Sequence, residues 1–79
     1  MRTVVVVDDH PGFRAQACKL LALAGYRVTG EAADGAAALL VASSVQPAVM
    51  VLDVQLPDIS GFEFVSRLLA GQGAAVQVI

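Results

Sequence analysis

The sequence predicts an α/β fold in which strands and helices alternate around a parallel sheet. Two short apolar runs, at 4–7 and 49–52, are typical of buried strands, and segments with helical spacing separate the runs. Glycine and proline stand at several of the junctions. A β-α-β-α series of this kind favours right-handed crossovers and a parallel sheet.

The first strand is expected over Thr3–Val7, a β-branched run without the alternation of a half-exposed strand. A helix follows from Pro11, because proline suits the first helical turn. Gly25 is a typical end for this helix. Its apolar positions recur at helical spacing: Phe13, Ala17, Leu20, Leu21 and Ala24.

A second, weaker strand is expected over Tyr26–Ala32, and its two charged residues favour a place near the sheet edge. Asp34 can cap a helix from about Ala36 to Ser43. The sequence Gln46-Pro47 then breaks that helix before the next strand. The predicted apolar side of the helix consists of Leu39, Leu40 and Val41.

The third strand is expected over Val49–Asp53. Ser60 and Glu63 form the S-x-x-E capping box of a third helix, which should run to about Ala70. Residues 76–79 predict the start of a fourth strand. The third helix should bury Phe62, Val65, Leu68 and Leu69, leaving Phe64 as the most exposed phenylalanine.

The chain has 79 residues, enough for one small domain. Its formal net charge of -2 leaves no basic surplus, so we expect no direct nucleic-acid binding by this segment. The single cysteine, Cys18, excludes an internal disulfide and fits a reducing cytoplasm. The first apolar run is too short for a signal-peptide core or a membrane span. We therefore expect a soluble cytoplasmic domain without a membrane partner.

Asp8 and Asp9 close the first apolar run, and Asp53 closes the second. Because open parallel sheets bind ligands at the carboxyl ends of their strands, these carboxylates should share one site. Two unit charges about 5 Å apart repel by roughly 3 kcal/mol at an effective dielectric of about 20, so the site needs a neutralising partner. A shared proton or a divalent cation could neutralise it, and Mg²⁺ accepts oxygen ligands.

These acids also have a purely structural interpretation. Asp53 could cap the turn after its strand, and Asp8 and Asp9 could be acids at the N-terminus of the first helix, where they complement its dipole. A lone histidine among acids does not match a zinc site or a phosphohistidine relay, so His10 is interpreted as a partly exposed residue leading into the helix. Cys18 is interpreted as a small, partly or fully buried apolar residue.

The motifs resemble the receiver domain of two-component response regulators over the whole chain. The residues that carry the resemblance follow the predicted strands or lie in the loop after the third one: Val7-Asp8-Asp9, Asp34-Gly35, Asp53, Pro57 and Gly61. Asp8-Asp9-His10-Pro11 with Phe13-Arg14 looks like the subgroup whose receivers precede a helix-turn-helix output domain. The resemblance implies a flavodoxin-like, doubly wound parallel sheet.

By this resemblance, the chain takes part in phosphorelay signalling as part of a transcriptional response regulator. Asp53 would accept a phosphoryl group from a sensor histidine kinase. A Mg²⁺ ion would be held by Asp9, Asp53 and the backbone carbonyl of Gln55, with Asp8 completing the acid cluster. Such a domain catalyses only its own phosphotransfer and dephosphorylation, and is not otherwise an enzyme.

The resemblance also implies that residues 1–79 form the N-terminal two thirds of a receiver, with about four strands and three helices and no output domain. The chain would be cut off within the fourth strand, before the Ser or Thr and the Lys that contact the phosphoryl group in the family. A bare strand edge invites pairing, so a homodimer or swapped dimer is a further expectation.

Two alternatives to the phosphoacceptor remain. The first is a truncated, non-switching module for protein interaction or dimerisation. The second is a phosphohydrolase that uses an aspartyl-phosphate intermediate in a similar fold. Those hydrolases resemble a D-x-D pattern, whereas here Asp8 and Asp9 are adjacent and the residue two past Asp53 is Gln55.

Overall fold

The computed structural model of the chain describes residues 1–53, 55–72 and 77–78. Strands and helices alternate along it, and the strands form one parallel sheet in the order β2-β1-β3-β4. The predicted α/β class is therefore confirmed. The elements are β1 (Thr3–Val7), α1 (Pro11–Leu23), β2 (Arg27–Ala32), α2 (Gly35–Val45), β3 (Val49–Leu52), α3 (Gly61–Gln72) and β4 (Gln77–Val78).

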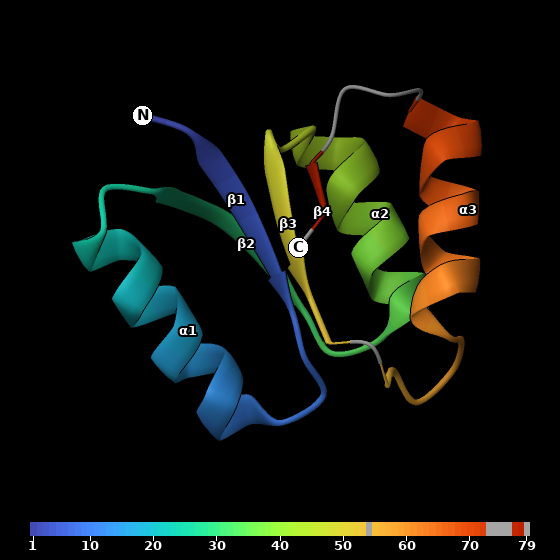
Figure 1. Cartoon of the computed structure of the whole chain (residues 1–79), viewed down its shortest axis with the longest axis horizontal. Coiled ribbons are helices and arrows are strands. Elements are labelled where there is room, and N and C mark those ends of the chain that lie inside the picture. The colour runs from blue at the N-terminus through green and yellow to red at the C-terminus, as the bar shows by residue number, and fades with distance from the viewer. Residues whose placement is uncertain (54, 73–76, 79) are drawn as a thin grey trace.

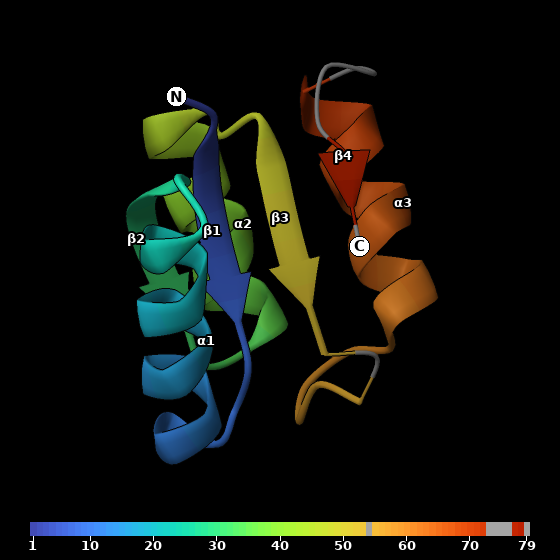
Figure 2. The ribbon, with the colours of Figure 1, turned by 60° about the vertical axis from the view of Figure 1, so that its left-hand side comes forward.

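Helices cover both faces of the sheet. Figure 1 shows α1 on one face and the pair α2 and α3 on the other. β2 lies at an edge of the sheet, as its charged residues predict, whereas β1 and β3 are paired in the middle. In Figure 2, β1 and β3 run in the same direction and end at the same side of the sheet. Whatever follows these two strands is therefore brought together.

The strands and helix ends follow from their residues. Val4–Val7 in β1 are at most 1% exposed, because helices pack on both sides of this strand. Pro11 opens α1, and Gly25 beyond its end takes the left-handed φ of 98°. Asp34 caps α2, as predicted, by accepting the Ala37 N–H at 2.7 Å. The structure places β4 at Gln77–Val78, within the predicted fourth strand, and residues 76 and 79 lie outside the described residues.

The buried face of α3 differs from the prediction. Phe64 is fully buried and Leu68 is 2% exposed, whereas Phe62 is 92% exposed. Leu69 is exposed as well, and Val65 packs partly against the core. The sequence of α3 is compatible with two overlapping apolar faces. The face that packs against the core is the one formed by Phe64 and Leu68, which lie one turn apart.

The predicted apolar sides of the other two helices also need correction. In α2 the fully buried side chains are Ala38 and Ala42, and Leu40 is 74% exposed. Small side chains on this face let α2 lie close to the sheet, and Leu39 and Val41 pack at the border of the core. No residue of α1 is fully buried, and two of its predicted apolar positions, Phe13 and Leu20, are 70% and 58% exposed.

The described residues contain no helix of sufficient length and apolar character to span a bilayer.

The contrast between Phe64 and Phe62 gives a matched pair of substitutions. Phe64→Ala should lower the free energy of unfolding by about 3 to 5 kcal/mol, because it removes a fully buried ring and leaves a cavity. Phe62→Ala should change it by no more than about 0.5 kcal/mol, because the ring is solvated. Urea denaturation followed by circular dichroism measures both. Equal losses in the two variants would contradict the assigned face of α3.

Candidate functional site

The ends of two neighbouring strands place the predicted acids. Val7 and Leu52 are paired in the β1–β3 ladder, and the Asp53 N–H extends it by donating to the Val7 carbonyl oxygen at 3.0 Å. On the other side of β1, the Asp8 N–H donates to the Ala32 carbonyl oxygen, also at 3.0 Å. Both acids are thus the first residues beyond parallel strands, and main-chain hydrogen bonds fix their backbones.

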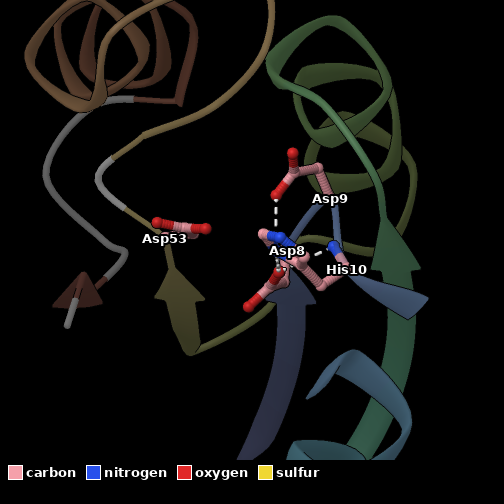
Figure 3. A group of neighbouring side chains, drawn as sticks. All are labelled: Asp8, Asp9, His10 and Asp53. Atoms are coloured by element: carbon pink, nitrogen blue, oxygen red, sulfur yellow. Dashed lines mark hydrogen bonds and ion pairs between the residues drawn. The ribbon is translucent and has the colours of Figure 1, made fainter. Parts of the chain in front are cut away.

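The side chains meet above this edge. Asp8, Asp9, His10 and Asp53 each offer one ligand atom, and these atoms lie within 4.8 Å of one another. Figure 3 shows the first three residues on the segment after β1 and Asp53 on the segment after β3. Asp8 and Asp53 are half-buried, while Asp9 and His10 reach solvent. The structure therefore brings together all three predicted carboxylates, at an edge that a ligand can reach.

His10 lies close to the acids, as its place in the sequence suggested. The ring nitrogen Nδ1 lies 3.0 Å from Asp9 Oδ1 and 3.3 Å from Asp8 Oδ1. The backbone N–H of His10 donates to Asp8 Oδ1 at 2.8 Å. The side chain is 63% exposed and packs edge-on against the Phe13 ring, with centroids 5.7 Å apart. His10 is thus a largely exposed residue leading into α1, as interpreted from the sequence, and one that also borders the acid cluster.

The interpretation of Asp8 and Asp9 as helix-capping acids does not match the structure. The N-cap of α1 is His10, and none of the side chains that the structure describes caps that end of the helix. Asp8 instead accepts the N–H of the N-cap residue itself. This local hydrogen bond holds the Asp8 carboxylate beside the other acids of the cluster.

The turn-capping interpretation of Asp53 does hold for one of its oxygens. Asp53 Oδ1 accepts the Gln55 N–H at 3.0 Å. A carboxylate has two oxygens and about four acceptor positions, so this bond is compatible with a second role. The same bond fixes the backbone of Gln55, which also forms an isolated antiparallel bridge with Ser60. The Gln55 carbonyl as a metal ligand stays a prediction.

Arg14 supports the cluster from α1, a role that its place in the sequence motif did not reveal. Its Nη1 donates to the backbone oxygen of Asp8 at 2.7 Å, and its Nε donates to Glu31 at 3.2 Å. The guanidinium therefore links α1 to the end of β1 and to β2. The sequence offered no spacing signal for these contacts, since Glu31 lies in another element and the Asp8 partner is a backbone atom.

Cys18 lies on α1 near this ion pair, and it is half-buried as expected. Burial raises the pKa of the Cys18 thiol, and the charge of Glu31 and a hydrogen bond to it raise that pKa further. The Arg14 charge acts in the opposite direction. Cys18 is therefore a weakly acidic thiol whose titration reports on the Arg14–Glu31 pair.

Asp58 is a second residue that the sequence analysis did not single out. Its carboxylate accepts the Gly35 N–H at 2.8 Å and the Ala36 N–H at 2.9 Å, at the N-terminus of α2. The bond from Gly35, followed by the bond from Ala36, lowers the pKa of the Asp58 carboxyl. No local pattern could predict these contacts, because the partners are more than twenty residues apart along the chain.

The ligand atoms of the cluster determine which metal ions it can bind. Carboxylate oxygens at this spacing repel one another, and one imidazole beside them can carry at most one positive charge against three carboxylates. Oxygen ligands suit the hard cations Mg²⁺, Ca²⁺ and Mn²⁺, whereas zinc sites favour cysteine and several histidines. The residues present therefore fit a divalent cation with oxygen preference.

Comparisons with known proteins agree with this geometry. Residues 4–79 match the family model of the response regulator receiver domain. A Pseudomonas aeruginosa protein described as a transcriptional regulator is 41% identical over 68 residues, 86% of this chain and 33% of its own length. Response regulator GacA of Pseudomonas protegens is 40% identical over 70 residues, 87% of this chain and 33% of its own length. This chain thus spans about a third of the length of these curated relatives.

A solved structure extends the likeness to the backbone. The crystal structure of a LuxR-family two-component response regulator from Aurantimonas sp. SI85-9A1 has a TM-score of 0.92 and 30% sequence identity. The match covers 99% of this chain and 56% of that chain. Structures of this kind share the flavodoxin-like receiver fold that the resemblance implied, and that expectation is confirmed.

The acidity of Cys18 tests the Arg14–Glu31 link to the site. Glu31→Gln should lower the pKa of Cys18, because it removes a negative charge that disfavours the thiolate. The pH profile of iodoacetamide alkylation should then shift to lower pH, with faster alkylation at a fixed mildly alkaline pH. Glu63→Gln is the matched control, because Glu63 pairs with Arg67 on α3. An identical profile for Glu31→Gln and the unmodified chain would contradict the described contact.

Proposed function

This chain belongs to the family of response regulator receiver domains, and on that premise we propose that Asp53 accepts a phosphoryl group from a sensor histidine kinase. The observation that carries the proposal is the convergence of Asp8, Asp9 and Asp53 within 4.8 Å at the ends of β1 and β3. An acid at this position is both close to a cation site and open to a large donor. Its backbone is held by the Val7 carbonyl, so the carboxylate is oriented before the donor arrives.

We assign the cation site to Asp9, Asp53 and the Gln55 backbone carbonyl, with Asp8 as the remaining acid. Mg²⁺ is the cation that the family resemblance implies, and its preference for oxygen ligands fits this donor set. When bound, it would supply the positive charge that offsets the carboxylates and lets an anionic phosphoryl group approach. The Asp8 and Asp9 side chains would hold the cation on one side of the acceptor.

The transfer itself needs one nucleophilic oxygen. An Asp53 carboxylate oxygen attacks the phosphorus of a phosphohistidine, an O–P bond forms, and the N–P bond breaks. The electron pair of the broken bond stays on the leaving imidazole nitrogen, so no oxidant or further reactant is required. The Gln55 N–H on Asp53 Oδ1 orients the carboxylate during the attack. The chain thus catalyses its own modification and is otherwise a signalling domain.

The alternative of a non-switching interaction module is not favoured, because the family match extends over residues 4–79 and the acids converge in the folded chain. For the whole protein, we propose transcriptional control, since a relative at 41% identity is described as a transcriptional regulator. We further propose a cytoplasmic location, where a histidine kinase would have access to this domain.

Phosphorylation of Asp53 can be tested with a small phosphodonor. Incubation with phosphoramidate and Mg²⁺ should add one phosphoryl group to the folded chain, and Asp53→Asn should abolish the adduct because the nucleophile is gone. Intact-mass spectrometry measures the adduct. Asp34→Asn is the matched control, because it changes an acid outside the cluster and keeps a capping side chain. An adduct that persists in Asp53→Asn would contradict the assignment.

Cation binding can be tested through stability. At a Mg²⁺ concentration of about 100 times the dissociation constant, the free energy of unfolding should rise by about 2.7 kcal/mol, and chelation should reverse the gain. Asp9→Asn should raise the stability without Mg²⁺, because it relieves repulsion in the cluster, and should remove most of the Mg²⁺-dependent gain. Urea denaturation with and without Mg²⁺ measures both the stability without the cation and the Mg²⁺-dependent gain. A full Mg²⁺-dependent gain in Asp9→Asn would exclude Asp9 as a ligand.

A further inference from the structure

The loop between β3 and α3 is fastened to the start of α2 by one carboxylate. Asp58 Oδ1 accepts the N–H groups of Gly35 at 2.8 Å and of Ile59 at 3.0 Å, and Oδ2 accepts the Ala36 N–H at 2.9 Å. Both oxygens are therefore engaged, and two of the donors belong to a different element. The loop that follows the proposed phosphoacceptor is thus held by hydrogen bonds that reach across the fold.

The first turn of α2 has two caps of different origin. Asp34, directly before the helix, accepts the Ala37 N–H, and Asp58, from the distant loop, accepts the Gly35 and Ala36 N–H groups. The first N–H groups of a helix have no partner within the helix, and negative charge is favourable there. The lowered pKa of Asp58 has the same origin, because the charged form receives these bonds. The contact is therefore complete at neutral pH and is lost only in acid, as pH falls through the lowered pKa.

Packing at Gly35 shows how closely the loop lies on the helix. A Cβ on Gly35 would come within 2.5 Å of Ile59 Cγ1 and 3.1 Å of Asp58 Oδ1. Any side chain at this position would have to displace the Ile59 side chain. Ile59 itself packs at the border of the core. The absence of a side chain at Gly35 thus leaves room for the side chains of Ile59 and Asp58.

The same loop contains Gln55, which is proposed to contribute its backbone carbonyl, and not its side chain, to the cation site. Gln55 is tied to Asp53 Oδ1 at one end of the loop and bridges to Ser60 at the other, and Leu56 between them is only 9% exposed. A backbone carbonyl can act as a ligand only where the path of the loop places it. The path from Gln55 to Ser60 is fixed by the buried Leu56 and by the Asp58 contact on α2.

We infer that Asp58 is a positioning residue of the cation site, which holds the acceptor loop against the N-terminus of α2 so that the Gln55 segment faces the acids. The inference rests on the proposed function, because it concerns the same cation site. Asp58 does not touch the cation in this account. A cap that only stabilised α2 would affect folding and leave cation affinity unchanged, and this difference separates the two roles.

The test compares Asp58→Ala with Asp34→Ala, since both remove a cap from the same helix and only Asp58 holds the loop. Mg²⁺ affinity is measured by isothermal titration calorimetry on variants shown to be folded by circular dichroism. Asp58→Ala should weaken Mg²⁺ binding by about 10-fold, as for loss of a residue that orients metal ligands. Asp34→Ala should bind like the unmodified chain. Asp58→Asn should lie between them, because the amide keeps one acceptor oxygen.

A second measurement, made without Mg²⁺, keeps the inference separate from the proposed function. Amide hydrogen exchange at Gln55 should be faster in Asp58→Ala than in Asp34→Ala, because only the former releases the loop. If the unmodified chain binds no Mg²⁺, the proposed function fails, and the exchange rates still decide whether Asp58 holds the loop. Unchanged Mg²⁺ affinity in folded Asp58→Ala, or equal exchange at Gln55 in the two variants, would overturn the inference. So would an equal loss of affinity in Asp34→Ala.

Discussion

The pairing of β1 with β3 is the constraint on which the site depends. The parallel register sets Val7 beside Leu52, and the Asp53 N–H adds the next hydrogen bond of the ladder. A slip of one residue would move one acid by about 3.3 Å and turn its side chain to the opposite face of the sheet. Main-chain hydrogen bonds on both sides of β1, from the Asp53 N–H to Val7 and from the Asp8 N–H to Ala32, hold this register. The register of the ladder thus fixes the distance between carboxylates that repel one another.

A second set of contacts fixes the backbone around the acids. In each of these contacts a charged side chain forms hydrogen bonds with backbone groups. Arg14 donates to the Asp8 carbonyl from α1, and Asp58 accepts N–H groups of α2 from the acceptor loop. Hydrogen bonds with a charged partner are stronger than neutral ones, and here they join elements that are distant in sequence. The acid cluster is therefore oriented by its neighbours while its solvent side stays open. Such an arrangement suits a site that must admit both a cation and a large phosphodonor.

Much of the fold and of the candidate site can be predicted from the sequence. The features that cannot be predicted are those that depend on which element packs against a helix face or a side chain. Strand β1, the Asp34 cap and the convergence of Asp8, Asp9 and Asp53 follow from local patterns and one rule about parallel sheets. The buried face of α3 does not follow, because Phe62 and Phe64 fit the helical pattern equally well until the sheet and α2 are in place. In α2, Ala38 and Ala42 face the core and Leu40 does not, because small side chains let the helix lie close to the sheet. Arg14 and Asp58 could not be assigned, because their partners are backbone atoms or residues in other elements.

The central claim is that the ends of β1 and β3 form one site for a divalent cation. Paramagnetic Mn²⁺, which shares the oxygen preference of Mg²⁺, locates such a site directly in a ¹⁵N-labelled sample. The account predicts that substoichiometric Mn²⁺ selectively broadens the amide signals of the Asp8–His10 segment and of Asp53 and Gln55, and that excess Mg²⁺ restores them. Broadening centred on other acids, or none at all in the folded chain, would contradict it.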